Sequence, residues 1–334
     1  MSKAINSGPK GTVQFSRIYR QAYRIEGNLG GKPLYLYFFD GKVKLLLDTG
    51  VKNSPNELIV PFLKSIGEKA SSIGIAINTH ADSDHFGGNS QLKRLSPSTI
   101  LAAHVNDRIL IEDPERIISE RYNMFSKEHG IHMTPNAQKN TRAMMGSYQE
   151  LDLLLQDGEI IRVDTGLQLK VLHVPGHSHG HLALYDAAKN ILFIGDAVLW
   201  KYIPDFDGKP ILAPTYIFFD DYLRTIRKMK KLRPNAIYSA HFPAKKGDDA
   251  IRFLDESEKF ALKLKEDLVD TITGARSPLS LMKLVDLIFE KYGFYPESTK
   301  MDLAYPIWGT LDNLIKTGTI RIKWSEGKMV YSKT

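Results

Sequence analysis

The segment at residues 79–88 concentrates side chains that bind metal ions. Six consecutive residues contain two histidines and two aspartates, and a glycine pair follows them: His80, Asp82, Asp84, His85 and Gly87-Gly88. Imidazole and carboxylate groups are the ligands of Zn, Fe and Mn in open catalytic sites. A solvated loop in which the aspartates form turns is the ordinary alternative, but it gives no reason for this density of ligands. The segment therefore predicts a metal-binding loop.

Three further ligand-type residues lie beside apolar runs elsewhere in the chain. His177 belongs to a glycine-bracketed histidine cluster at 174–181, Asp196 ends the apolar run 191–195, and His241 ends the run 236–240. The loop at 79–88 itself follows an apolar run at 73–77. Short apolar runs of this kind indicate buried strands, and α/β folds place their sites at the carboxyl ends of strands. The sequence thus predicts one site, assembled by several rigid strands.

Taken together, these residues resemble the signature of the metallo-β-lactamase fold family of hydrolases. The family pattern is His-x-His-x-Asp-His followed by a later His, Asp and His, and it matches the set His80, Asp82, Asp84, His85, His177, Asp196 and His241. Asp48-Thr49-Gly50 matches an early strand-end motif of the family, and the resemblance runs from about residue 12 to about residue 272. One position departs from the pattern, because Asp82 stands where a second histidine is expected.

The resemblance implies an α/β fold, specifically an αββα sandwich, with a centre for two divalent metal ions. The first ion would be held by His80, Asp82 and His177. The second would be held by Asp84, His85 and His241, with Asp196 bridging both. Two such ions, roughly 3.5 to 4 Å apart, share a hydroxide and polarise the bond under attack. Asp84 and Asp196 are then the candidate catalytic residues.

The carboxylate at position 82 changes the charge of that centre. With two divalent ions and a bridging hydroxide, Asp82, Asp84 and Asp196 bring the sum to zero, whereas a neutral histidine at 82 would leave one positive charge. The centre is therefore expected to be a weaker Lewis acid. Zn is the first candidate for the metal. Carboxylate is a harder ligand than imidazole and shifts the preference towards Fe or Mn, which are the alternatives. A role for Asp82 outside the ligand set stays open, and replacing it by histidine is expected to be tolerated.

Composition limits the class of protein. The chain has 334 residues, 43% hydrophobic and 25% charged, with a net charge of +7 and no cysteine. No stretch approaches the ~18 to 20 apolar residues of a membrane span, and residues 1–10 lack the apolar core of a signal peptide. We expect a cytoplasmic protein that does not enter a membrane. Without cysteine, thiolate chemistry and disulfides are excluded.

Several local elements can be predicted from pattern. Two apolar runs at 35–39 and 43–47, separated by Asp40-Gly41-Lys42, indicate a hairpin. Ser54 and Glu57, with Pro55 between them, predict a helix with a capping box that runs to about residue 66. Residues 105–150 are expected to form a helical insertion. A helix at 222–233 has a basic face, composed of Arg224, Arg227, Lys228 and Lys231.

The chain divides into a catalytic domain at 1–273 and a small domain at 274–334. The second part has two helical patterns followed by two strand patterns around Ser325-Glu326-Gly327. It resembles the winged-helix domain that follows the catalytic domain in the lactamase-B2-like branch of the family. Its charge is only mildly basic, so packing or association as a homodimer is favoured over nucleic-acid binding.

Three functions from different classes remain. The favoured one is metal-dependent hydrolysis of an ester, thioester or lactone in a small-molecule substrate. The first alternative is a single-strand-specific nuclease or ribonuclease, which would use the basic helix and the winged-helix-like domain to hold a nucleic acid. The second alternative is a diiron redox protein, because some proteins of this fold have a carboxylate at the position of Asp82. The sequence does not identify the substrate, the metal or the oligomeric state.

Overall fold

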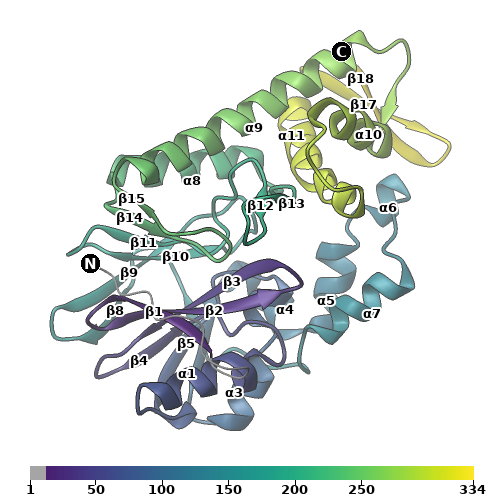
Figure 1. Cartoon of the computed structure of the whole chain (residues 1–334). Coiled ribbons are helices and arrows are strands. Elements are labelled where there is room, and N and C mark those ends of the chain that lie inside the picture. The colour runs from purple at the N-terminus through teal and green to yellow at the C-terminus, as the bar shows by residue number, and fades with distance from the viewer. Residues whose placement is uncertain (1–12) are drawn as a thin grey trace.

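The computed structural model describes residues 13–334 and contains two large sheets that face each other (Figure 1). The first sheet has seven strands, and their spatial order equals their order along the chain. Strands β1 to β4 are antiparallel, and β4 to β7 are parallel. Its strands are β1 (Gln14–Tyr19), β2 (Ala22–Leu29), β3 (Lys32–Phe39), β4 (Lys44–Leu47), β5 (Ile73–Ile77), β6 (Ile100–His104) and β7 (Leu153–Leu155).

The second sheet has six strands in the order β15-β14-β11-β10-β9-β8. Strands β11 and β14 are parallel and the other pairs are antiparallel. Its strands are β8 (Ile160–Asp164), β9 (Leu167–His173), β10 (Leu182–Asp186), β11 (Ile191–Phe193), β14 (Ala236–Tyr238) and β15 (Lys245–Lys246). The apolar runs identified in the sequence at 73–77, 191–195 and 236–240 form strands as predicted, although the last two strands end at residues 193 and 238.

Strand β3 shows how the layers are built. Its alternate residues Tyr37 and Phe39 point between the sheets, where both pack edge-on against Phe193 of the second sheet at centroid distances of 5.2 and 4.9 Å. Leu36 and Phe38 belong to a different cluster, on the helix-covered face. Because successive side chains of a strand point to opposite faces, a strand that is apolar at every position must be covered on both sides.

Helices cover the outer faces of both sheets, which completes the expected αββα sandwich. The first sheet is covered by η1 (Pro55–Ile59), α1 (Val60–Ser65), η2 (Ala70–Ser72), α2 (Ser83–Phe86) and α3 (Asn89–Leu95). Six short helices lie between β6 and β7: η3 (Val105–Asp107), α4 (Arg108–Glu112), α5 (Pro114–Ile117), η4 (Ile118–Tyr122), α6 (Ser126–His129) and α7 (Pro135–Ala143). The second sheet is covered by α8 (Phe219–Leu232) and α9 (Asp248–Gly274), beside a small ribbon of β12 (Ile203–Pro204) and β13 (Pro210–Leu212).

The hairpin predicted around residues 40–42 is confirmed, but the capping box at Ser54 is wrong. Strands β3 and β4 pair through Tyr37–Leu47 and Phe39–Leu45. The Ser54 side chain makes no capping bond to the helix, and its hydroxyl accepts the N–H of Val51 at 3.0 Å instead. Ser54 itself has helical dihedral angles. The turn that follows it, η1, is a π-helix, which the motif did not predict.

Residues 275–334 pack onto the second sheet's helices. They form β16 (Leu279–Ser280), α10 (Leu281–Tyr292), η5 (Glu297–Leu303), α11 (Ala304–Lys316), β17 (Ile320–Ser325) and β18 (Lys328–Lys333), with the strands in the order β16-β18-β17. Their apolar residues belong to the same hydrophobic cluster as those of α8 and α9. The domain boundary near residue 274 and the winged-helix assignment stay predictions.

Within residues 13–334, no helix has the length and apolar character needed to cross a membrane.

Candidate metal centre

Every ligand-type residue selected from the sequence lies at one edge of the two facing sheets. His80 follows β5, Asp84 and His85 lie in the short helix α2, and Asp82 immediately precedes that helix. His177 lies in the loop between β9 and β10, Asp196 follows β11, and His241 follows β14. The four histidines are at most 1% exposed. Strand ends from both sheets thus deliver their side chains to a single buried place.

The donor atoms form three overlapping groups, in each of which one atom per residue lies within 4.8 Å of the others. Two of the groups are those expected for two metal ions: His80, Asp82 and His177, and then Asp84, His85 and His241. The third group lies between them and consists of His80, His85 and Asp196. The predicted ligands therefore converge, and their roles as ligands stay a prediction.

Backbone and hydroxyl oxygens hold the far nitrogens of the histidine rings. His177 Nδ1 lies 3.1 Å from the carbonyl of Thr215, and His241 Nδ1 lies 2.6 Å from the carbonyl of Pro33. His80 Nδ1 lies 2.9 Å from the hydroxyl of Thr79. Because a carbonyl can only accept a hydrogen bond, Nδ1 of His177 and His241 must carry the proton. Their Nε2 atoms are then free to donate an electron pair to a metal.

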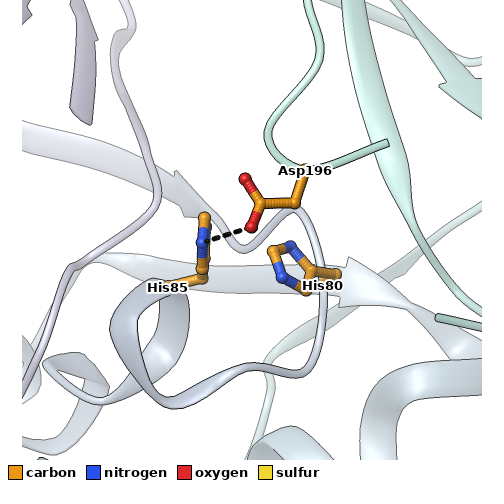
Figure 2. A group of neighbouring side chains, drawn as sticks. All are labelled: His80, His85 and Asp196. Carbon is orange, nitrogen blue, oxygen red and sulfur yellow. Dashed lines mark ion pairs between the residues drawn. The ribbon is translucent and has the colours of Figure 1, made fainter. Parts of the chain in front are cut away.

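The central group is the part of the site that best fits a metal ion (Figure 2). His80 Nε2, His85 Nε2 and one oxygen of Asp196 are buried and have no hydrogen-bond partner. The other Asp196 oxygen lies 3.7 Å from His85 Nε2 and 3.2 Å from His241 Nε2. Buried polar atoms without partners are costly unless something binds them. Two imidazoles and a carboxylate are a donor set that suits Zn, Fe or Mn.

Burial and neighbouring charges shift the pKa values of this group. Burial lowers the pKa of His80 to about 3, with a further contribution from His85. Burial by itself raises the pKa of Asp196, but His241 and His85 outweigh it and hold the pKa well below its usual value. Burial likewise lowers the pKa of His85, but Asp48 and Asp84 outweigh it and raise the pKa well above its ordinary value. His85 must therefore release a proton when a metal binds.

Asp48, from the early Asp-Thr-Gly motif, orients this group. Its backbone has φ of 64°. One carboxylate oxygen accepts the N–H of Thr79 at 2.7 Å, and the other lies 2.8 Å from His85 Nδ1. A carboxylate behind a ligand histidine fixes the ring and increases its basicity. His181 has a related role, since its Nε2 accepts the N–H of Asp196 at 3.0 Å. His181 therefore supports Asp196 from behind and is outside the three groups of candidate ligands.

Arg121 is a residue of the site that the sequence did not reveal. It comes from η4 and donates two hydrogen bonds to Asp82, from Nε at 2.6 Å and from Nη2 at 3.0 Å. Its Nη1 also donates to the backbone carbonyl of His177 at 3.1 Å. The guanidinium side chain is 5% exposed. Burial raises the pKa of Asp82, but Arg121 and then the hydrogen bond with His177 outweigh it and hold the pKa well below its usual value.

Lys32 is the second residue that the sequence did not reveal. It begins β3 at the end of the β2–β3 hairpin, and its Nζ lies 2.6 Å from Asp84 Oδ2 and 3.4 Å from His241 Nε2. Burial lowers the pKa of this ammonium group, but Asp84 and Asp196 outweigh it and raise the pKa above its ordinary value. The group is therefore a cation. No spacing in the sequence pointed to it, because it lies 52 residues before Asp84.

The C-terminal part of the chain also approaches the site. Asp302 of η5 lies near enough to Lys32 for an electrostatic interaction. Tyr305 of α11 lies near enough to Arg121 for one as well. Burial raises the pKa of Asp302 to about 7, against the opposing effect of Lys32. The ring of Tyr305 packs edge-on against Phe125 at 5.1 Å. Residues after 274 therefore contribute to the surroundings of both cations.

The metallo-beta-lactamase superfamily model matches residues 30–241 of this chain. That match covers more than half of the 334 residues and includes every candidate ligand. The chain belongs to the metallo-beta-lactamase superfamily. The resemblance inferred from the histidines and aspartates is thereby confirmed. The aspartate at position 82, where the family pattern has a histidine, therefore occurs in a member of the superfamily.

Relatives in the superfamily include enzymes named for thioester substrates. Acyl-coenzyme A thioesterase MBLAC2 from Homo sapiens is 29% identical over 163 residues, which is 47% of this chain and 50% of that protein. Hydroxyacylglutathione hydrolase GloC from Haemophilus influenzae is 26% identical over 136 residues, 41% of this chain and 55% of that protein. The chain spans about half the length of these curated relatives.

A solved superfamily structure shares the fold over nearly the whole chain. The metallo-beta-lactamase family protein from Thermus thermophilus has a TM-score of 0.74 with 21% identity, and the alignment covers 95% of this chain and 100% of that one. This likeness confirms the αββα architecture. Because the alignment covers 95% of this chain, the structural match also includes residues after 274. It carries no information about substrate.

Proposed function

We propose that the chain is a metal-dependent hydrolase of ester-type bonds in small molecules, with thioesters as the preferred class. The observation that carries this proposal is the convergence of His80, His85 and Asp196, whose buried donor atoms have no partner in the folded chain. The names of the relatives, a thioesterase and a hydroxyacylglutathione hydrolase, favour an acyl group bound to sulfur over a lactone or a simple ester.

The chemistry needs a strong nucleophile and a polarised carbonyl group. A divalent ion held by His80, His85 and Asp196, with Zn as first candidate and Fe or Mn as alternatives, would supply both by lowering the pKa of water and withdrawing electrons from the acyl oxygen. Asp196 has one oxygen near His241 and one without a partner, so it could hold such an ion and orient the attacking water beside it. Asp84 is held by Lys32 and keeps its second oxygen towards His85, 3.9 Å away. No serine or cysteine nucleophile is required.

Neither alternative function gains support from a specific contact. Three of the four cations on the basic face of α8 are paired with carboxylates, which weakens the case for a nuclease. The carboxylate at position 82, which suggested a diiron redox protein, is bound by Arg121. Cytoplasmic location, homodimer formation and nucleic-acid binding stay predictions.

The test is a substrate panel applied to one purified preparation. The protein is stripped with a chelator, reloaded with Zn²⁺, Mn²⁺ or Fe²⁺, and assayed with an acyl-coenzyme A, an acylglutathione, an aryl ester, a lactone and single-stranded RNA. We expect thioester turnover that disappears with the metal and returns with one of the three ions. Asp196→Asn should abolish turnover, and Asp207→Asn, at an exposed carboxylate in the turn between β12 and β13, serves as the matched control.

Two outcomes would contradict the proposal. One is cleavage of RNA with no turnover of any ester-type substrate, which would favour the nuclease. The other is thioester turnover that survives complete removal of metal, because the site would then act without the ion for which its donor atoms are arranged.

A further inference from the structure

Two of the three donor groups in the metal centre already contain a cation supplied by the chain. The ammonium of Lys32 contacts Asp84 and His241, which belong to the group expected for a second metal ion. The guanidinium of Arg121 contacts Asp82 and His177, which belong to the group expected for the first. Each cation is therefore bound to atoms that a metal ion would need.

Lys32 is positioned as a substitute for a metal ion. Its Nζ is 2.6 Å from Asp84 Oδ2 and 3.4 Å from His241 Nε2, and the same two acceptor atoms lie 3.4 Å from each other. The ammonium thus stands beside both donors, with a side chain 15% exposed. For a metal ion to bind there, the lysine must first leave two buried acceptors and find a new partner.

Arg121 engages the first group from its outer side. Nη2 lies 3.0 Å from Asp82 Oδ2 and 3.2 Å from His177 Nε2. Asp82 Oδ2 itself lies 2.7 Å from His177 Nε2 and 3.3 Å from His80 Nε2. The guanidinium thus lies beside both Asp82 Oδ2 and His177 Nε2, the two atoms through which these residues would bind a metal ion.

The central group is free of both cations. Neither Lys32 nor Arg121 forms a hydrogen bond or ion pair with His80, His85 or Asp196, as far as the described part of the chain extends. The atoms left without partners, His80 Nε2, His85 Nε2 and one Asp196 oxygen, belong to this group (Figure 2). Three protein ligands with a fourth position open are the arrangement of catalytic zinc sites.

The charges of the cluster match one divalent ion and not two. Four buried or nearly buried carboxylates face this pocket, from Asp48, Asp82, Asp84 and Asp196, and Lys32 and Arg121 cancel two of their negative charges. Two negative charges remain, which one divalent ion neutralises. A second divalent ion that displaced Lys32 from the pocket would leave one positive charge in a buried region, where unpaired charge is strongly unfavourable.

We propose that the centre binds a single divalent ion through His80, His85 and Asp196, and that Lys32 replaces a second ion at Asp84 and His241. This inference rests on the proposed function, because it concerns the same site, and it narrows the two-ion expectation drawn from the family resemblance. Lys32 thereby fixes the metal stoichiometry. It also keeps Asp84 ionised and oriented without a metal ligand bond.

The experiment measures zinc stoichiometry in the full chain. The parent and Lys32→Met are stripped with a chelator, titrated with Zn²⁺ in a calorimeter, and analysed for bound Zn after dialysis. We expect one Zn per parent chain and a second in Lys32→Met, whose affinity for the second ion should be at least about tenfold higher than that of the parent. Lys42→Met is the matched control, since Lys42 is exposed on the β3–β4 turn and should leave one Zn bound.

Two carboxylate variants test the location of the ion independently. Asp196→Asn should lose Zn, and Asp84→Asn should retain one Zn, because Asp84 is bound to Lys32 in our proposal. Thermal unfolding by circular dichroism verifies that each variant is folded. If Lys32→Met does not fold, Asp84→Asn decides. One Zn in both the parent and Asp84→Asn would support the inference, whereas less Zn in Asp84→Asn than in the parent would identify Asp84 as a ligand and overturn it.

The outcomes separate this inference from the proposed function. Two Zn ions of similar affinity in the parent, or one Zn in both the parent and Lys32→Met, would overturn the inference and leave the hydrolase proposal standing. A parent chain that binds no Zn²⁺, Mn²⁺ or Fe²⁺ would overturn both. Failure of the substrate panel with one Zn bound would overturn only the proposed function.

Discussion

Asp82 binds Arg121, and this single contact changes the charge argument made from the sequence. A carboxylate was expected to make the centre a weaker Lewis acid than the usual histidine. The Asp82–Arg121 pair, with hydrogen bonds of 2.6 and 3.0 Å, has no net charge and in this respect resembles the neutral histidine of the family pattern. The weakening expected from Asp82 alone is therefore offset by a residue 39 positions away.

The first prediction concerns this ion pair. Asp82→His leaves the buried guanidinium of Arg121 without its carboxylate, and removing one partner of a buried pair costs about 3 to 5 kcal/mol. Histidine at 82 is therefore expected to destabilise the fold, contrary to the tolerance expected from the sequence. The double variant Asp82→His with Arg121→Met should recover most of the loss. Unfolding in urea, followed by circular dichroism, gives the four free energies of this cycle.

A matched control for that cycle is available in the preceding helix turn. Arg116 pairs with Glu120 on the surface and has a side chain 47% exposed, so Arg116→Met should cost no more than about 1 kcal/mol. Equal stability of Asp82→His and the parent would show that the Arg121 pair contributes little.

Among the elements, η5 brings a carboxyl group with an unusual pKa towards the site. Asp302 has a pKa raised from 3.8 to about 7, chiefly by burial. The folded chain therefore binds a proton more tightly than the unfolded chain between these two values. Stability from this group is complete below about pH 4 and is lost as the pH rises through about 7.

The second prediction is that Asp302→Asn flattens this pH dependence. One pKa unit corresponds to about 1.4 kcal/mol, and solvent reaches this half-buried carboxyl. The net gain of Asp302→Asn at pH 8 relative to pH 4 should therefore be on the order of 1 to 2 kcal/mol. Thermal unfolding across that pH range, at constant ionic strength, measures it. Glu297→Gln, a change at an exposed carboxylate in the same element, should follow the parent curve; identical curves for Asp302→Asn and the parent would refute the shift.

Helix α8 has its basic face largely neutralised by carboxylates of the helix itself and of other segments. Arg224 pairs with Asp221, Arg227 with Glu258 of α9 at 2.6 Å, and Lys228 with Asp157 at 2.9 Å. A cation that already has a carboxylate partner releases fewer counterions when it meets a phosphate. We therefore expect this helix to bind nucleic acid weakly, a point that its sequence alone left open.

The third prediction applies this to binding of single-stranded RNA. Neutralising Arg224, Arg227, Lys228 and Lys231 together should change the slope of log affinity against log salt by less than about one unit, which is about one phosphate contact. Fluorescence anisotropy at several salt concentrations measures the slopes of parent and variant. A steep slope in the parent that collapses in the variant would restore the nuclease as the favoured function.

Across the whole molecule, the C-terminal part and the second sheet share one hydrophobic core. Buried residues of α10 and α11 lie in the same cluster as those of α8 and α9. Polar contacts cross the same boundary: Tyr295 donates to the carbonyl of Lys201 at 2.6 Å, and Asn313 donates to Asp220 at 2.8 Å. Such a shared core is typical of parts that stabilise each other rather than of independent modules.

The fourth prediction follows from that shared core. Deleting residues 275–334 exposes the apolar faces of α8 and α9, so the truncated chain should aggregate or melt many degrees below the parent. Soluble yield and thermal unfolding measure this. Trp324→Ser, at a position 63% exposed on β17, should leave both unchanged. A truncated chain that stays soluble and melts like the parent would support an independent domain at 274–334.

The sequence by itself determined which side chains could bind a metal and which strands precede them, and its resemblance to the family indicated the sandwich. The strands and the residues at their ends are local features: an apolar run predicts a strand, and a histidine or aspartate at its end stays at its end after folding. The same local signals predicted the β3–β4 hairpin. At Ser54 a local signal was wrong. The hydroxyl accepts the N–H of Val51 instead of capping the helix, and Ser54 itself has helical dihedral angles.

Only the tertiary structure decided which charges meet in the site. Lys32 contacts Asp84 from 52 residues away and His241 from 209, and Arg121 contacts His177 from 56. Sequence periodicity carries no information about such distances, because any exposed lysine or arginine has the same local pattern. Burial then increases the interaction energy of these contacts, because an ion pair enclosed by two sheets is screened far less by water than one on a surface. Residue types and spacing indicated a metal centre, and packing placed Lys32 and Arg121 inside it.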